Sequence, residues 1–437
     1  MKKLLSLAAV LILYSGLTFA AGRNQNTGSA SGPIEVTVPH YMSGQNVGAL
    51  FFLPQVERFN AKYAGKYKLT IEELVQDMYG PKMQQLSQQG KLPALVLGGA
   101  TEWLEEYIIP GNMFADLKPW LDSKPDLKNR LIPANLEYNT KNGRVFSVGY
   151  PVVRPVGIFY NTKLYKPSAS FAEMSWDDVS AELGSNKIAF MTSENAWTTM
   201  LVLSSLIAIQ PGGPELLQAG YFNKITDFNN PIFINAFTKL QQLLQKHASS
   251  NTLGAAYADA ANSFMSMNSA LISNGSWMIG DFAPEQSSKW SNGFNGNDVH
   301  AGVLPGNVAI GGTGIGYGWW IPSTVSLQEQ ELAKAFLEFM LSPEEIEAYM
   351  LAEGGSSPRI QPSPAFLAER AKNRLMDEYA GAVKANTILS YSFQDATPNS
   401  LGDGGEFGKL LPLLINGTYT PEQFCRELTN KAKETIR

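Results

Sequence analysis

Acidic side chains that lie close together in the sequence are the first candidates for chemistry. Glu102, Glu105 and Glu106 fall within five residues of one another. Hydrolysis of a glycosidic bond requires two carboxylates that face each other across a cleft. The simpler interpretation places Glu105 and Glu106 on the solvated face of a helix, and we favour it. The sequence therefore predicts no catalytic residue.

The histidines do not form a metal-binding pattern. The chain has three, His40, His247 and His300, and none has an acid or a cysteine at the spacing of metal ligands. We expect His247 to lie in solvent at a polar helix end. The motifs of serine hydrolases, zinc peptidases and P-loop NTPases are missing from the sequence. We therefore expect neither a metal site nor a bound cofactor.

A glycine-rich stretch, GGTGIGYGWWIP, occupies residues 311–322. Glycines lack Cβ atoms and so let a ligand approach backbone N–H groups. A dinucleotide-binding loop opens a helix whose N-terminus holds the pyrophosphate. Here an extended segment through Pro322 follows instead, and the next helix is expected near Leu327. The stretch is predicted to line another kind of ligand site, and a tight crossover between strands is the alternative.

Aromatic residues make up 11% of the chain and charged residues 17%. Trp103, Trp197, Trp277 and Trp319 stand beside loops at predicted strand or helix ends. Flat rings at such places stack on the apolar faces of sugar rings, although each tryptophan could also pack in a core. Because the formal net charge is −5, nucleic acid and anionic membranes are poor partners for this chain.

The N-terminus has the pattern of an export signal. Two lysines precede a short apolar run at residues 4–13, and small residues at 18 and 20 predict cleavage after Ala20. Residues 21–33 are polar and rich in glycine and serine, which predicts a disordered leader. No cysteine follows the cleavage point, and the only cysteine, Cys425, leaves no partner for a disulfide. We expect a soluble periplasmic protein without a lipid anchor.

The elements that must position these residues alternate between strands and helices. Apolar residues alternate in 34–38 as in a strand, and one helical face follows in 53–63. Later segments repeat this order, with a helix capped by Ser175, a nearly all-apolar helix in 197–209 and a final amphipathic helix after Thr420. This pattern predicts an α/β fold with a mainly parallel sheet, divided into more than one domain.

Five segments carry a family resemblance through their order and spacing. They are PVGIFYNTKLYKP (155–167), SALISNGSWMIG (269–280), AIGGTGIGYGWWIP (309–322), AKAFLEFMLSPEE (333–345) and LINGTYTPEQF (414–424). Together they resemble the extracellular solute-binding proteins of ABC importers, and most of all the maltose- and glycerol-3-phosphate-binding type. The resemblance covers essentially the whole mature chain.

The resemblance implies a periplasmic-binding-protein fold with two discontinuous α/β lobes and a ligand cleft at the hinge. The first lobe is expected at 34–147 and 298–325, and the second at 148–297 and 326–437. The lobes are expected to close over a small molecule, and an ABC permease in the membrane would accept it from the closed form. A monomer is implied, and a sensor in place of a permease is the alternative partner.

The family's ligand contacts carry over unevenly onto this chain. Tyr79 matches a ligand-contacting tyrosine, Gly275 and Ser276 match a serine pair, and Gly312 matches a glycine beside a phosphate. Glu102 stands near the place of an expected glutamate. The predicted ligand-binding residues are Tyr79, Glu102, Trp103, Arg154, Trp197, Gly275, Ser276, Trp277, Gly312 and Trp319.

Arg154 stands where the glycerol-phosphate group has a small serine. Two further departures, Ser356 in place of a tyrosine and the lack of a counterpart to a late arginine, favour a sugar as ligand. A mono- or oligosaccharide is therefore the predicted ligand, because rings, amides, arginine and acids suit its apolar faces and hydroxyl rim. Glycerol-3-phosphate or a glycerophosphodiester is the first alternative, and a secreted glycan hydrolase is the second.

Overall fold

The computed structural model describes residues 32–44, 46, 48–75, 78–98, 103–311, 315–402 and 405–435. The predicted export signal and almost all of the predicted leader lie outside these ranges, as do Glu102 and Gly312. In the described ranges, we find no helix that combines the length and apolar character needed to cross a membrane.

The first lobe combines the N-terminal elements with two that come much later in the chain. β1 and β2 are parallel, with Ile34 opposite Tyr67, and α1 connects them. The elements of this lobe are β1 (Ile34–His40), α1 (Ala49–Lys62), β2 (Tyr67–Glu73), α2 (Tyr79–Gln88), β3 (Val96–Leu97), the π-helical turn η2 (Leu104–Ile108), α4 (Lys118–Asp122), α5 (Pro125–Arg130), α6 (Pro133–Tyr138), β4 (Thr140–Lys141), β5 (Arg144–Val145), β6 (Ser147–Val148), β11 (Trp319–Trp320) and α12 (Leu327–Met340).

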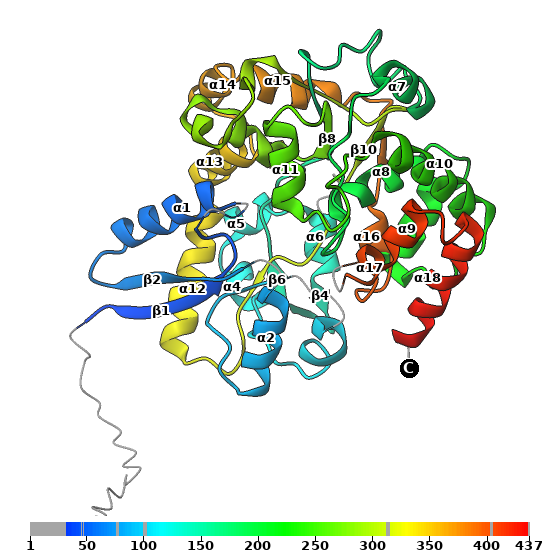
Figure 1. Ribbon diagram of the computed structural model, residues 1–437. Coiled ribbons are helices and arrows are strands. Elements are labelled where there is room, and N and C mark those ends of the chain that lie inside the picture. The colour runs from blue at the N-terminus through cyan, green and yellow to red at the C-terminus, as the bar shows by residue number, and fades with distance from the viewer. Residues whose placement is uncertain are drawn as a thin grey trace, which may run out of the picture.

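The second lobe contains most of the helices (Figure 1). Its core includes α8, in which every residue after Trp197 is buried. The elements are β7 (Gly157–Asn161), α7 (Trp176–Leu183), α8 (Trp197–Ala208), α9 (Gly213–Asn223), α10 (Pro231–His247), α11 (Tyr257–Met265), β8 (Leu271–Asn274), the short helical turns η3 (Ser276–Phe282), η4 (Pro284–Lys289) and η5 (Gly296–Asp298), β9 (Val299–Gly302), β10 (Val308–Ile310), α13 (Pro343–Glu353), α14 (Pro364–Arg370), α15 (Arg374–Ala382), β12 (Ile388–Ser390), α16 (Phe393–Ala396), α17 (Glu406–Ile415) and α18 (Pro421–Thr435).

Strand pairing in the described residues is mixed, so the expectation of a mainly parallel sheet is wrong. β1–β2 and β10–β12 are parallel. By contrast, β11 pairs antiparallel with β3 and β6, and β7 pairs antiparallel with β8 and β9. The reason is that strands returning from later in the chain complete each sheet, and such strands need not follow the direction of a β-α-β unit.

Hydrophobic packing corrects the expected lobe boundaries in two places. Helix α12, assigned to the second lobe from the sequence, belongs to the core of the first, where the Phe336 ring lies 5.2 Å from that of Phe59. Strands β9 and β10, both assigned to the first lobe, belong to the second, where β9 pairs with β7 and β10 pairs with β12. In Figure 1 the yellow α12 accordingly lies among the blue elements of the first lobe. These segments therefore belong to the lobe against which they pack, and not to the lobe that the resemblance implies.

Several local predictions are confirmed by the helix ends. Ser175 caps α7 as expected, since its hydroxyl accepts a hydrogen bond from the Asp178 N–H and Asp178 accepts one in return from the Ser175 N–H. Thr420 likewise accepts from the Gln423 N–H at the start of α18. The expectation for His247 is wrong, because it is fully buried and bonded to Ser180 and the Asn186 carbonyl.

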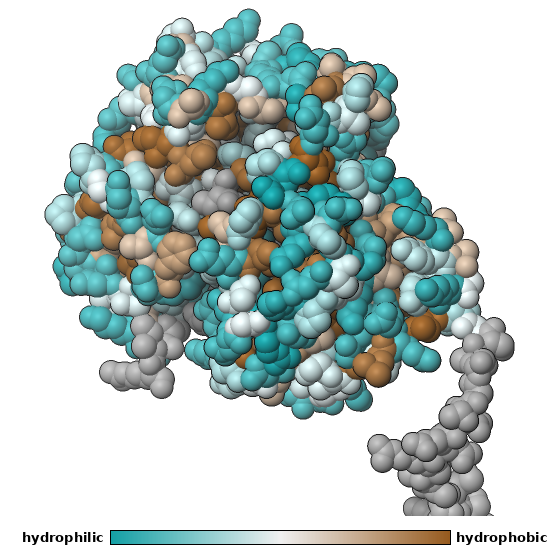
Figure 2. Space-filling model, turned by 180° about the vertical axis from the view of Figure 1, so that it is seen from behind, coloured by the Kyte–Doolittle hydropathy of each residue, from teal (hydrophilic) through white to brown (hydrophobic). Residues whose placement is uncertain are grey.

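Hydrophilic side chains cover much of the face shown in Figure 2, and hydrophobic ones appear between them in separate patches. The most exposed large apolar residue described is Leu327, the first residue of α12, at 78%. Single exposed apolar residues are normal on globular proteins. The surface therefore does not by itself mark a binding site.

The described part of the glycine-rich stretch is a tight crossover. A Cβ on Gly318 would lie 2.1 Å from the Val148 carbonyl oxygen, because β11 and β6 are neighbours. The N–H groups of Gly311, Gly316 and Gly318 already donate to oxygens of the protein. Gly318 therefore serves packing, and the N–H groups of all three glycines are engaged within the protein.

Replacing Gly318 by alanine should lower the free energy of unfolding by about 1–3 kcal/mol, because backbone must move to admit the methyl group. Urea unfolding of the purified protein measures this. The matched control is Gly381→Ala in α15, where no atom lies within 4 Å of the new Cβ, so stability should be unchanged or slightly higher. Equal effects of the two substitutions would contradict the packing role of Gly318.

Candidate functional site

The candidate site lies where α8, η3 and α13 of the second lobe meet the crossover segment that comes from the first lobe. The crossover contains Arg154, α8 begins with Trp197, and η3 follows β8 with Ser276 and Trp277. Helix α13 packs against both η3 and the first-lobe helix α1, and Figure 1 shows it between the lobes. The site is therefore placed next to the junction on which any lobe movement must depend.

Arg154 is held between two aromatic rings. Its guanidinium carbon lies 5.0 Å from the ring centroid of Trp277 and 5.0 Å from that of Tyr349. Arginine over an aromatic face gains about 0.5–2 kcal/mol, and more as the pair is desolvated. The planar guanidinium is thus fixed in orientation, and its N–H edge is fixed with it.

A buried carboxylate also holds the Arg154 side chain in place. One guanidinium N–H donates to Glu353 at 3.1 Å, and the Glu353 side chain is only 10% exposed. Among the described residues this is the only acceptor for the Arg154 side chain. The Glu353 carbonyl also accepts from the Ser276 hydroxyl at 2.6 Å. Arg154 therefore keeps further N–H donors for a ligand, and its charge is balanced by one carboxylate.

Two glycines make room for this arrangement. A Cβ on Gly275 would lie 2.2 Å from the Trp277 ring, which folds back over the backbone of its own turn. Gly355 has φ near +93°, and a Cβ there would lie 2.5 Å from Cγ of Arg154. Positive φ is unfavourable for other residues. Gly275 therefore acts through Trp277, and the predicted match to a serine that touches ligand does not describe its environment.

Trp277 belongs to a row of aromatic rings along the second lobe. Its ring centroid lies 5.6 Å from that of Trp197, which lies 6.3 Å from that of Tyr257. Trp197 and Trp277 are half-buried, so parts of both rings remain accessible. The Tyr257 hydroxyl is bonded to Asn274, which fixes this ring at the end of β8. We call Arg154, Trp197, Tyr257, Trp277, Tyr349 and Glu353 the aromatic–arginine cluster.

A polar network links the cluster to the first lobe. The Tyr349 ring stacks on Tyr150 with centroids 4.0 Å apart and planes within 12°. The Tyr150 hydroxyl bonds Gln55 of α1, and Gln55 also donates to Glu345 at 3.0 Å. Because Glu345 begins α13 and Tyr349 lies one turn later, α1 fixes the helix that carries both Tyr349 and Glu353.

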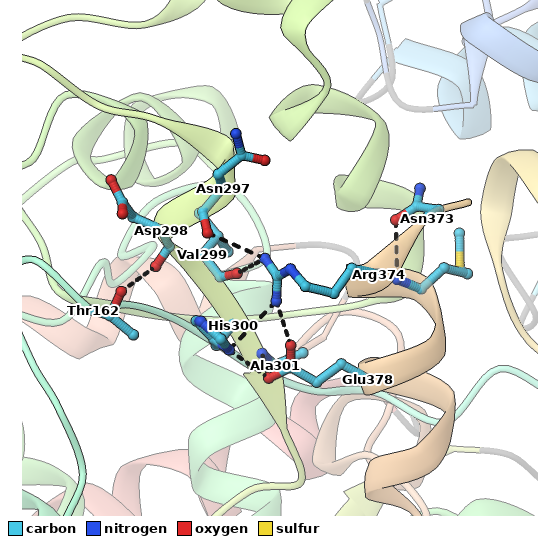
Figure 3. A network of polar contacts seen from close by, with 10 residues as sticks. Thr162, Asn297, Asp298, Val299, His300, Ala301, Asn373, Arg374 and Glu378 are labelled. Atoms are coloured by element: carbon cyan, nitrogen blue, oxygen red, sulfur yellow. Dashed lines mark hydrogen bonds and ion pairs between the residues drawn. The ribbon is translucent and has the colours of Figure 1, made fainter. Parts of the chain in front are cut away.

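A second network holds α15 against β9 (Figure 3). Glu378 accepts from Arg374 at 2.6 Å and bonds His300 at 2.9 Å, while Arg374 also donates to the Val299 carbonyl. On the same helix, the Tyr379 hydroxyl accepts from the Gly157 N–H and lies 3.0 Å from the carbonyls of residues 155 and 274. This hydroxyl joins the start of β7 to the end of β8.

Burial dominates the titration of the cluster. It raises the pKa of Glu353, an effect that Arg154 opposes and nearby Asp281 reinforces. Burial also raises the pKa of Tyr349 and of Tyr257 to about 12. The phenols are therefore neutral at physiological pH and can donate or accept hydrogen bonds.

The structure brings together only part of the predicted set. Arg154, Trp197, Gly275, Ser276 and Trp277 lie together, as described above. The other predicted site residues that the structure describes, Tyr79, Trp103 and Trp319, lie in the first lobe, apart from the cluster.

Tyr79 and Trp319 have packing roles. The Tyr79 side chain is buried and its hydroxyl accepts from the Leu97 N–H at 2.9 Å. Trp319 is 3% exposed and stacks between His40 and Phe52 in the core, so the prediction that it lines the ligand site is corrected. Trp103 is half-buried beside Trp320, while Glu102 and Gly312 lie outside the described residues.

Sequence reasoning missed Tyr257, Tyr349 and Glu353. A signal existed for two of them, because Tyr349 and Glu353 are four residues apart before the Gly354–Gly355 pair, and that spacing puts both on one helix face. Nothing in the sequence links α11, which carries Tyr257, to this place. That contact depends on how α11 and β8 pack together.

The cluster offers binding groups more than reactive ones. It presents aromatic faces, guanidinium N–H donors and neutral phenols, a set suited to a polar molecule with some apolar surface. Its one carboxylate, on Glu353, is engaged by Arg154. Searching the described ranges reveals no group of three or more histidine, cysteine or acidic side chains arranged to hold a metal ion.

The family of this chain is shown by a match to a protein-family model. The family model described as bacterial extracellular solute-binding protein matches residues 55–365. No curated protein sequence matches. A solved chitin oligosaccharide binding protein is 19% identical with a TM-score of 0.72, and the match covers 92% of this chain and 98% of that one.

Two further solved structures have the same fold. One, from a study of xylan utilization by Caldanaerobius polysaccharolyticus, is 16% identical with a TM-score of 0.70, over 91% of this chain and all of that one. The other, a solute-binding protein of Streptococcus pneumoniae in complex with the blood group A-trisaccharide, is 17% identical with a TM-score of 0.67, over 92% and 100%. The two-lobed α/β fold predicted from the sequence is confirmed.

Because the pKa of Glu353 is raised, we predict that the free energy of unfolding falls as the pH rises. The folded state holds this proton more tightly than the unfolded state, so ionisation costs folding free energy as pH rises above the ordinary value of 4.5. Relative to Glu353→Gln, the native protein should therefore lose unfolding free energy as pH rises from 4.5 through the raised pKa. Urea unfolding of both proteins between pH 4 and pH 8 measures the difference.

Asp178 is the control with the opposite sign. Its pKa is lowered by hydrogen bonds from the Ser175 hydroxyl and N–H. The native protein should gain stability relative to Asp178→Asn as pH rises through the lowered pKa toward its ordinary value of 3.8. Urea unfolding of this pair is therefore extended below pH 3.8. A pH-independent difference between native protein and Glu353→Gln would show that this carboxyl is not perturbed.

Proposed function

The chain belongs to the bacterial extracellular solute-binding proteins, and from this premise we propose that it captures a carbohydrate between its lobes for delivery to an ABC permease. The proposal includes export to the periplasm and action as a monomer. The aromatic–arginine cluster is the observation that carries it. Trp197 and Trp277 supply faces for a sugar ring, and Arg154 supplies N–H donors for hydroxyl groups.

Charge balance favours a neutral sugar over a phosphate ester. Arg154 is paired with Glu353 at 3.1 Å, so the cluster has no uncompensated positive charge from this arginine. A phosphate would approach the Glu353 carboxylate as well as the guanidinium, at a Coulomb cost that grows with burial. The binding partners named for the similar structures, a chitin oligosaccharide and a blood group trisaccharide, support the same ligand class.

Lobe closure provides the mechanism. A ligand that contacts both lobes in the closed form and one lobe in the open form shifts the population toward closure. The cluster would bind first because its rings and arginine are already positioned. We place the first lobe at residues 34–149 and 315–341 and the second at 152–310 and 343–435, following the packing of the described residues within these bounds, with hinges at residues 150–151 and at residue 342.

Binding without catalysis is part of the proposal. The family is one of solute-binding proteins, and one similar structure described above is a chitin oligosaccharide binding protein. In the cluster, Glu353 is committed to Arg154, which leaves it poorly placed to act as one of two opposed catalytic carboxylates. A sensitive assay for release of reducing ends from oligosaccharides should therefore give no signal above buffer.

Removal of the Trp277 ring should weaken carbohydrate binding at least tenfold, since both the stacking surface and one wall of the Arg154 sandwich are lost. Calorimetry with Trp277→Ala measures this effect. Trp120→Ala is the control, because Trp120 is a partly buried tryptophan packed in the first lobe. Unchanged affinity in Trp277→Ala, with the fold intact, would remove Trp277 from the site.

The ligand class is tested by thermal unfolding of the mature protein against mono- and oligosaccharides, polyols, glycerol-3-phosphate and glycerophosphodiesters. Ligand at one hundred times Kd adds about 2.7 kcal/mol to stability, so a true ligand raises Tm visibly. We expect a response to a saccharide. A response confined to the phosphate esters would reject the carbohydrate assignment, and no response from folded protein would reject both classes.

A further inference from the structure

A cavity with walls from both lobes lies away from the aromatic–arginine cluster. Its water-accessible volume is about 350 Å³, and its lining comes from η2, α6 and β4 of the first lobe and from α9 and the residue after it in the second. Pockets for small molecules begin near this size, at about 300 Å³. The two sites share no residue, and Figure 1 shows β4 and α9 apart from α13.

Tyrosine side chains connect the lobes beside this cavity. The ring centroids of Tyr138 and Tyr221 lie 6.2 Å apart across the lobe boundary, and Tyr138 lies 5.0 Å from Tyr317. The Tyr221 hydroxyl donates to the Ile315 carbonyl at 3.0 Å, and the Tyr317 hydroxyl donates to Glu105 at 2.9 Å. Since these hydroxyls are already engaged, the walls offer a ligand ring surface more than phenol groups.

The cavity also contains an incompletely paired cation. The Lys141 ammonium lies 4.5 Å from the Tyr138 ring centroid and 5.4 Å from that of Tyr317. No carboxylate of the described residues forms an ion pair with it, and Glu105 acts on it only from a greater distance. Burial lowers the pKa of Lys141. Its N–H donors are thus available inside a partly desolvated space.

The remaining lining groups define the ligand chemistry. Phe222 is 52% exposed and presents an uncovered apolar ring at the cavity. Lys224 donates to the Asp395 carbonyl at 2.9 Å, and Glu137 adds a carboxylate near the surface. The two lysines and two glutamates of the lining balance in charge. A neutral molecule with hydroxyl groups and an apolar face fits this combination better than an anion does.

We propose that this interlobe cavity is a second binding site for a neutral sugar or polyol, separate from the aromatic–arginine cluster. Phe222 and Tyr221 provide the ring surface, and Lys141 and Glu137 bond the hydroxyl groups. Because its walls belong to different lobes, the fit of an occupant depends on the angle between them.

Thiol protection tests the site directly. Thr140 is exposed and lines the cavity, whereas the only native cysteine, Cys425, is fully buried and burial raises its thiol pKa to about 12. In Thr140→Cys, a maleimide reagent should therefore label position 140 alone. Labelling rates are measured while maltose, or separately N,N′-diacetylchitobiose, is titrated. Ser288→Cys, at an exposed serine of η4, is the control for effects of the sugars on the reaction itself.

We expect saturable protection at position 140 and none at position 288. Adding Phe222→Ala should raise the half-protecting sugar concentration several-fold, and adding Trp277→Ala should leave it within twofold. Protection that vanishes with Trp277→Ala would mean that the thiol only reports closure around the first site, and the second site would be rejected. No protection by either sugar would also reject the second site. Failure of the proposed function would be seen separately, in calorimetry, as carbohydrate binding that does not depend on Trp277 or is not detected at all.

Discussion

The Arg154 guanidinium, stacked between Trp277 and Tyr349 and paired with Glu353, is the interaction on which the site depends. Trp277 lies on η3, whereas Tyr349 and Glu353 both lie on α13, so the contact fixes the crossover, η3 and α13 relative to one another. The pairing stabilises a half-buried cation, because a charge that is partly removed from water is costly when it has no partner. The same pairing leaves the cluster close to neutral, and this neutrality decides which ligands it can accept.

The sequence patterns predicted the local architecture well because that architecture is set by local physics. The cap at Ser175 and the buried helix after Trp197 follow from hydrogen-bonding side chains at a helix start and from apolar content along its length. The lobe boundaries were less predictable. Phe336 joins the first lobe because its face matches that of Phe59, and a match between two surfaces far apart in sequence leaves no periodic signal.

The candidate site was half predictable for the same reason. Trp197 and Trp277 follow loops at element ends, which is where accessible rings occur. Trp319 has the same local setting, yet the return of β11 between β3 and β6 buries it. Glu353 escaped notice because its role comes from Arg154, 199 residues away. Residue type and local pattern propose candidates, and only tertiary packing separates a binding tryptophan from a core one.

The pairing of Trp197 with Trp277 also makes the site optically distinctive. With ring centroids 5.6 Å apart and planes inclined by 41°, the two indoles are close enough for their electronic transitions to interact. The nearby guanidinium adds a fixed positive charge beside one of them. The protein's near-ultraviolet circular dichroism and intrinsic fluorescence therefore contain a contribution from these two rings. The aromatic–arginine cluster can thus be followed spectroscopically without an added dye.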